Sequence, residues 1–141
     1  MANKIYHATE TAVIFAESGG TVSFTPKNIS SGAGRISAQW DRGSGSKPRR
    51  YKWYAKTKAA AALSVTSAKS LEIYLATARD GANTVVSGNQ GTTDAAFASG
   101  DKRNNLQRVG FVLADSTSNG EVQIGSGEVL ISDRYISVVW W

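Results

Sequence analysis

The feature that most limits the fold of this chain is the regular alternation of apolar and polar side chains along short segments. In residues 35–42, apolar side chains stand at every second position from Ile36 to Trp40 and polar ones stand between them. Residues 50–56 repeat the pattern, with Trp53 at the centre of the apolar positions. Period two is the signature of a β-strand that buries one face. Both segments are therefore expected to be half-buried antiparallel strands.

Glycine-containing turns separate the expected strands, and the chain has 14 glycines. The further expected strands are residues 20–24, 63–66, 71–76, 83–86, 108–113, 121–124, 127–130 and 135–140. The triplet Gly125, Ser126 and Gly127 is interpreted as a turn between two of them. Many short strands at this spacing predict an all-β fold, a single antiparallel β-sandwich of jelly-roll or Greek-key type.

The 141 residues fit one domain, residues 1–141, with residues 1–19 as a candidate N-terminal arm. The chain has no cysteine, so neither disulfides nor thiolate metal sites can support the fold. The apolar run at residues 12–16 is too short for a signal-peptide core or a membrane span. We expect a soluble protein that is made in a cytosol and does not contact a membrane.

Residues suited to catalysis are few and scattered. The single histidine, His7, has only Glu10 as a nearby acid, which is a poor start for a metal site or a general base. The sequence has no nucleophile elbow, phosphate-binding loop or dinucleotide fingerprint. Most other acids stand at expected turns, and Glu72 is interpreted as part of a solvated strand face. We expect no enzymatic activity, no metal and no cofactor.

The strongest polar feature is a basic segment at residues 35–58, which holds half of the chain's 16 lysines and arginines and a single acid, Asp41. Such a concentration creates a positive field that attracts anionic partners. The alternation leaves Tyr54 as the one aromatic side chain on the basic face, so an acidic protein surface fits better than nucleic acid. A solvated face with no partner remains open. The candidate partner-binding residues are Arg42, Lys47, Arg49, Arg50 and Lys52.

Two adjacent tryptophans, Trp140 and Trp141, end the sequence. Neighbouring residues on a strand point to opposite faces, so only one of the two rings can enter a given core. The other needs a second surface, and tryptophan is frequent at interface hot spots. The exposed one of Trp140 and Trp141 is therefore a candidate subunit contact. The other two tryptophans of the chain are expected in the core rather than stacked on sugars.

Two segments, RVGFVL at residues 108–113 and DRYISVVWW at residues 133–141, carry a resemblance. With the Ala- and Thr-rich start and the glycine turns, they resemble small virion structural proteins of tailed bacteriophages. The resemblance implies a β-rich, often trimeric subunit that is made in the host cytoplasm and clamps the major capsid protein on the capsid exterior. On this model the subunit interface would consist of Trp140 or Trp141 together with Ile5 and Tyr6 of the N-terminal arm. Relatives tend to continue past this last strand, so a neighbour is expected to complete the terminus if no further strand follows.

The sequence thus predicts a non-enzymatic virion structural protein, first of all a capsid decoration or cement subunit and a homo-oligomer, with a trimer favoured. A phage tail or baseplate protein is the alternative within the same class. A carbohydrate-binding β-sandwich module is the alternative from another class, and it requires an exposed tryptophan. A nucleic-acid binder ranks third, and its binding would weaken steeply with salt.

Overall fold

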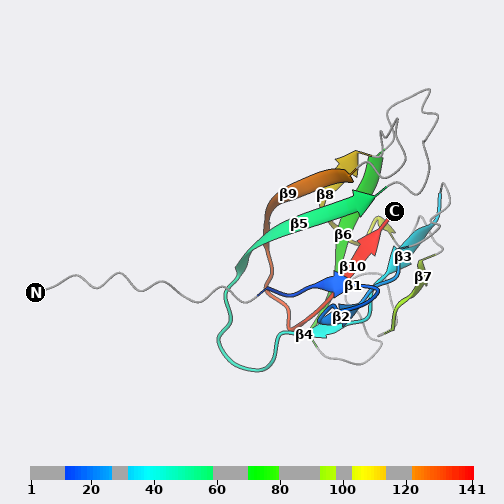
Figure 1. Ribbon diagram of the computed structural model, residues 1–141. Helices are drawn as coiled ribbons and strands as arrows, with labels where there is room; N and C mark the ends of the chain where they lie inside the picture. Colours follow the sequence, from blue (N-terminus) through cyan, green and yellow to red (C-terminus); the bar gives the residue numbers. More distant parts are fainter. Residues whose placement is uncertain (1–11, 27–31, 59–69, 80–92, 98–102, 114–121) are drawn as a thin grey trace, which may run out of the picture.

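A computed structural model describes residues 12–26, 32–58, 70–79, 93–97, 103–113 and 122–141 (Figure 1). The strands formed by these residues are β1 (Phe15–Ala16), β2 (Val22–Ser23), β3 (Gly34–Ile36), β4 (Trp40–Asp41), β5 (Arg50–Lys58), β6 (Ser70–Ala78), β7 (Ala95–Phe97), β8 (Gln107–Leu113), β9 (Val122–Leu130) and β10 (Tyr135–Trp140). The predicted all-β fold class is confirmed. The expected strands at residues 63–66 and 83–86 lie outside the described residues.

The largest sheet has the order β7-β3-β10-β6-β8, with β4 also paired to β10. All of these pairs are antiparallel. Strand β10 is central: it pairs with β6 along its whole length, from Tyr135 opposite Ala78 to Trp140 opposite Ile73. On its other side it pairs with β3 and β4. A separate short pair, β1 with β2, is parallel and lies in the N-terminal part of the described chain.

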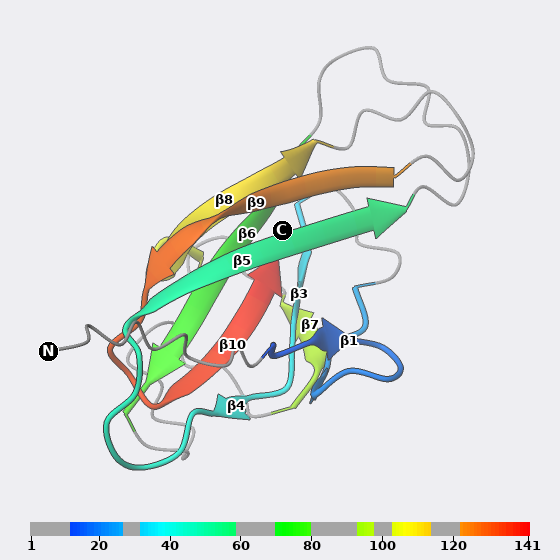
Figure 2. The ribbon, with the colours of Figure 1, turned by 60° about the vertical axis from the view of Figure 1, so that its left-hand side comes forward.

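A long two-stranded ribbon, β5 with β9, covers one face of this sheet (Figure 2). Its antiparallel register runs from Arg50 opposite Leu130 to Lys58 opposite Val122. The apolar side chains that join the two layers are Leu75, Ile136, Ile73 and Val138 from the sheet and Tyr51, Trp53, Ala55 and Val129 from the ribbon. The ribbon is therefore held by burial of its alternate side chains.

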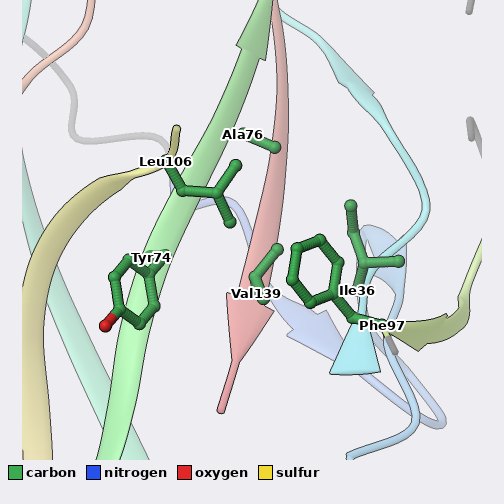
Figure 3. Packing of buried hydrophobic residues seen from close by; sticks show 6 residues of the cluster. All are labelled: Ile36, Tyr74, Ala76, Phe97, Leu106 and Val139. Atoms are coloured by element: carbon green, nitrogen blue, oxygen red, sulfur yellow. The ribbon is translucent and has the colours of Figure 1, made fainter. Parts of the chain in front are cut away.

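The opposite face of the sheet has its own apolar cluster, made of Ile36, Tyr74, Ala76, Phe97, Leu106 and Val139 (Figure 3). The ring of Phe97 lies between Val139 and Ile36 in this view. Leu106 reaches the cluster from the segment just before β8. The central sheet thus buries apolar side chains on both of its faces.

The expected single strand at residues 35–42 is wrong in one respect, because it is two short strands separated by residues 37–39. Ile36 pairs with Val139 and Trp40 pairs with Ile136, so the three residues between the pairs face only two on β10. The hydroxyl of Ser37 accepts a hydrogen bond from the N–H of Val138 at 2.9 Å. This extra residue reverses the alternation. Ile36 and Trp40 therefore pack on opposite faces of the sheet.

The expected turn at residues 125–127 is also wrong, because these residues lie inside the continuous strand β9. The two glycines are needed for close packing and not for a turn. A Cβ at Gly127 would lie 2.9 Å from Nε1 of Trp53, and a Cβ at Gly110 would lie 2.7 Å from its Cη2. A Cβ at Gly125 would lie 2.7 Å from the carbonyl oxygen of Phe111. Trp53 is thus seated over two glycines from neighbouring strands.

Both terminal tryptophans pack against this same chain. Trp140 meets Phe24 edge to face, with ring centroids 5.5 Å apart, and Trp141 meets Phe97 in the same way at 5.7 Å. The backbone of Trp141 exchanges two hydrogen bonds with Glu72, each 2.9 Å long. The second surface expected for one of the tryptophans therefore exists within the chain.

The close packing of Trp53 against Gly110 predicts that the substitution Gly110→Ala lowers the stability of the fold substantially. The added methyl group meets the indole ring, and overpacking of this kind costs about 2 kcal/mol of unfolding free energy. Urea denaturation of Gly110→Ala and of Ser126→Ala, an exposed position on the ribbon, measures the difference. Ser126→Ala should change stability by less than about 0.5 kcal/mol. Trp53→Leu should remove most of the penalty of Gly110→Ala, because the two positions are in contact. Equal stability of Gly110→Ala and the parent chain would contradict this packing.

Candidate functional site: an exposed ribbon face and a basic depression

The outward side of the β5–β9 ribbon combines cationic and apolar side chains. We call this surface the ribbon face; it consists of Arg50, Lys52, Tyr54, Lys56, Val122, Ile124, Ser126, Glu128 and Leu130. Its large apolar side chains are unusually open to solvent, with Tyr54 77 %, Ile124 70 % and Leu130 65 % exposed. The prediction that Tyr54 stands on the basic face while Tyr51 and Trp53 pack inward is confirmed.

The charge of the ribbon face is mainly positive. Its acid, Glu128, stands opposite Lys52 in the register and lies 3.9 Å from Arg50, with both members of that pair well exposed. An exposed pair at this distance adds little stability and leaves both charges available. Two predicted partner-binding residues, Arg50 and Lys52, therefore lie together on an open surface.

The β4–β5 loop, residues 42–49, surrounds a shallow depression of about 370 Å³. Its lining residues are all Arg, Lys, Ser or Gly, and none of them has a purely apolar side chain. The cations are Arg42, Lys47, Arg49 and Arg134; the hydroxyls come from Ser44, Ser46 and Ser132. Gly43 and Gly45 have φ angles of +81° and +102°, a left-handed conformation that other residues adopt only with strain. We call this feature the loop depression.

Arg42 was expected to contact a partner, and the structure corrects this, because its side chain is buried and only 7 % of the residue is exposed. Its guanidinium donates hydrogen bonds to Tyr51 Oη at 3.0 Å, to the carbonyl of Ile131 at 3.3 Å, and to the carbonyls of Asp133 and Pro48. It also lies 5.2 Å from the centroid of the Tyr51 ring. Arg42 therefore ties the β4–β5 loop to the β9–β10 connection and forms the floor of the loop depression.

A second ionic contact holds the same region. Arg134 donates two hydrogen bonds of 2.7 Å to Asp41, one to each carboxylate oxygen. The Arg134 contact lowers the pKa of Asp41 to about 2, and a hydrogen bond from the Gly43 N–H adds to the effect. Asp41 raises the pKa of Arg134 in turn. The guanidinium of Arg134 therefore compensates the negative charge of Asp41.

The remaining predicted site residues divide into three groups. Lys47 and Arg49 are exposed on the rim of the loop depression, and no ion pair involves them in the part of the chain that the structure describes. Ile5 and Tyr6 lie outside the described residues. Trp140 and Trp141 are half-buried within the chain and give no separate argument for a subunit interface.

Glu72 is part of a network and not a free carboxylate on a solvated face. Arg108 and Arg103 lie 3.1 Å and 3.6 Å from its oxygens, and Tyr74 donates a hydrogen bond to it. Burial, together with that hydrogen bond, raises the pKa of Tyr74. Within the described ranges no group of three or more His, Cys, Asp or Glu side chains is placed to hold a metal ion.

Asp94, one of the acids expected at turns, is also engaged, since its carboxylate accepts a hydrogen bond from Arg35 at 2.7 Å. Burial alone would raise its pKa, but the contacts with Arg35 and Thr25 lower it overall.

The described residues contain no helix that is long and apolar enough to cross a membrane.

No protein-family model, no curated protein and no solved structure matches this chain. Function must therefore be argued from the surfaces described above.

The hydrogen bonds of Arg42 predict that the substitution Arg42→Lys is strongly destabilising. An ammonium group cannot reproduce the planar fork, so buried carbonyl groups lose their donors at a cost of about 3 kcal/mol. Chemical denaturation measures this loss. Arg49→Lys, which removes the same group from the exposed rim, is the matched control and should stay within about 0.5 kcal/mol. Similar behaviour of the two variants would refute the structural role of Arg42.

The Asp41–Arg134 pair predicts a defined acid dependence. Because the pKa of Asp41 is depressed in the folded chain, its contribution to stability is complete above about pH 4 and is lost as the pH falls through about 2. Asp41→Asn should therefore flatten the decline of unfolding free energy between these pH values. Arg134→Gln should flatten most of it but leave the smaller part that the Gly43 N–H supplies, and the double variant should behave as Asp41→Asn does. A parent-like decline in either single variant would contradict the pairing.

Proposed function

We propose that this chain is a non-enzymatic virion structural protein, a capsid decoration or cement subunit that binds the major capsid protein lattice. The class of protein comes from the resemblance of residues 108–113 and 133–141 to small virion proteins of tailed bacteriophages. The observation that carries the binding role is the ribbon face, where exposed apolar side chains stand among cations.

The composition of the ribbon face supports a protein partner. Isolated exposed apolar residues are common, but a group of them on one strand pair marks an interaction surface. Tyr54 on β5 and Ile124 on β9 are diagonal neighbours across the strand pair, because Tyr54 is opposite Ser126 and Ile124 is opposite Lys56. Tyrosine and arginine are enriched at the centres of protein interfaces. The face therefore combines apolar anchors with the charges that orient a partner.

The positive charge of the ribbon face selects the kind of partner. Arg50, Lys52 and Lys56 outnumber the single acid Glu128, so an acidic surface is complementary. Single-stranded nucleic acid needs several stacking rings along the charged groove, whereas Tyr54 is the one aromatic ring on this face. An acidic patch of a capsid protein satisfies both the charge and the apolar anchors.

The stability of the fold is also consistent with this role. The chain has no cysteine, and its core is closed by packing on both faces of the central sheet. We include in the proposal that the sheet and the ribbon are the two layers of one β-sandwich. A phage tail or baseplate position remains the alternative within the class, because the same surface would serve there. The sugar-binding alternative loses its main argument, since all four tryptophans are half-buried against other side chains.

The proposal predicts that the purified chain co-sediments with expanded shells assembled from the major capsid protein encoded in the same genome. Lys52→Glu should weaken this binding about tenfold, because it places a negative charge against an acidic partner. Tyr54→Ala should weaken it by about the same factor if the ring is an anchor. Arg79→Glu, an exposed charge reversal outside the ribbon face, is the matched control and should bind as the parent does.

The outcomes separate the parts of the proposal. Absence of binding by the parent chain to shells, or a genome without a major capsid protein, would refute the decoration role. Binding that survives Lys52→Glu and Tyr54→Ala would refute the ribbon face as the contact. Light scattering after size exclusion tests the expected trimer separately, because avidity from several linked copies requires a stable oligomer or assembly on the lattice.

A further inference from the structure

The loop depression differs from the ribbon face in its chemistry. Its lining residues are Arg, Lys, Ser and Gly, and it lies at the end of the ribbon where the β4–β5 loop meets the β9–β10 connection. The lining exposes more polar than apolar surface, so a ligand is recognised mainly through charge and hydrogen bonds. The volume of about 370 Å³ is enough for a small charged group.

The charge on the floor of the depression has no acid to neutralise it. Arg42 is buried, and all of its hydrogen-bond partners are neutral: Tyr51 Oη and the backbone carbonyls of Ile131, Asp133 and Pro48. The surrounding protein has a lower dielectric constant than water, which strengthens the field of this charge toward the open side. The floor therefore attracts anions.

The neighbouring acid does not cancel this field. Both oxygens of Asp41 are engaged by Arg134, and Oδ1 also accepts a hydrogen bond from the Gly43 N–H at 2.7 Å. Lys47 and Arg49 form no ion pair in the described ranges, although Lys47 lies near enough to Asp41 to help lower the pKa of that carboxyl. The lining thus carries more positive charge than its one adjacent carboxylate can balance.

The rim supplies donors suited to an oxyanion. Ser44, Ser46 and Ser132 bring three hydroxyl groups to the lining. A Cβ at Gly43 would lie 3.4 Å from Nζ of Lys47, so the lysine side chain folds back over the loop and its ammonium lies beside Gly43. Lysine as a mobile point charge, arginine as a planar fork and serine hydroxyls form a donor set that suits phosphate oxygens.

We propose that the loop depression binds a phosphate group, either as free phosphate or as a phosphate monoester. Arg42 provides the fixed positive floor, while Lys47 and Arg49 provide the direct cationic contacts. The serine hydroxyls donate to the remaining oxygens. This site is separate from the ribbon face, so its failure would leave the proposed function untouched, and the reverse also holds.

The test uses the full chain, labelled with ¹⁵N, titrated with inorganic phosphate and with glucose 6-phosphate at constant ionic strength set with chloride. Saturable shifts are expected at the amide signals of residues 43–47 and of Ser132. A tighter response to glucose 6-phosphate would identify a monoester as the ligand, and a tighter response to inorganic phosphate would identify the free ion. Shifts that do not saturate, or that are spread over the ribbon face instead, would overturn the proposal.

Variants make the test specific to the site. Lys47→Gln and Arg49→Gln should each weaken phosphate binding about tenfold, since a charge-assisted hydrogen bond is lost in each. Both residues are exposed, so the fold should be retained, which circular dichroism checks. Lys52→Gln and Lys56→Gln remove the same charge from the ribbon face and should change the affinity less than about twofold. An equal loss in both sets would show only a response to net charge and would overturn the site.

Discussion

The structure depends on the burial of both faces of one strand, β10. Ile136, Val138 and Trp140 pack on the ribbon side, while Val139 and Trp141 pack on the other. A strand that is apolar on both faces must lie between two covering layers, and β10 is also central within its sheet, with β6 on one side and β3 and β4 on the other. Each face of the sheet then requires its own cover.

The cover on one side is the ribbon, and its position is determined by close packing at glycines. Trp53 can approach β8 and β9 only because Gly110 and Gly127 have no side chain in its way. With Trp53 seated inward, the strand's other face is turned to solvent, and this exposes Tyr54 together with Lys52 and Lys56. The surface that we assign to partner binding is thus a consequence of how the core is closed.

The sequence predicted the strands well where no extra residue interrupts the strand itself. Residues 50–56 and 135–140 are strands, and Tyr54 faces outward as expected. It failed at residues 35–42, where Ser37 adds a residue opposite β10 and reverses the alternation. It failed again at Arg42, although period two places this arginine on the same face as Trp40. A buried arginine was not expected, because two of the three carbonyl groups that accept its hydrogen bonds, those of Ile131 and Asp133, are about ninety residues further along the chain.

The sequence by itself therefore determined the all-β fold class, the solvent-facing side of β5, and the concentration of positive charge at residues 35–58. These properties follow from neighbouring residues, since alternation and charge density are local. Only the tertiary structure decided which of those charges remain available. Arg42 is buried and hydrogen-bonded inside the protein, and Arg134 pairs with Asp41. Lys47, Arg49, Arg50 and Lys52 remain exposed on the surface. The physical reason is that burial and hydrogen bonding depend on segments distant in sequence, and the strand pattern carries no information about them.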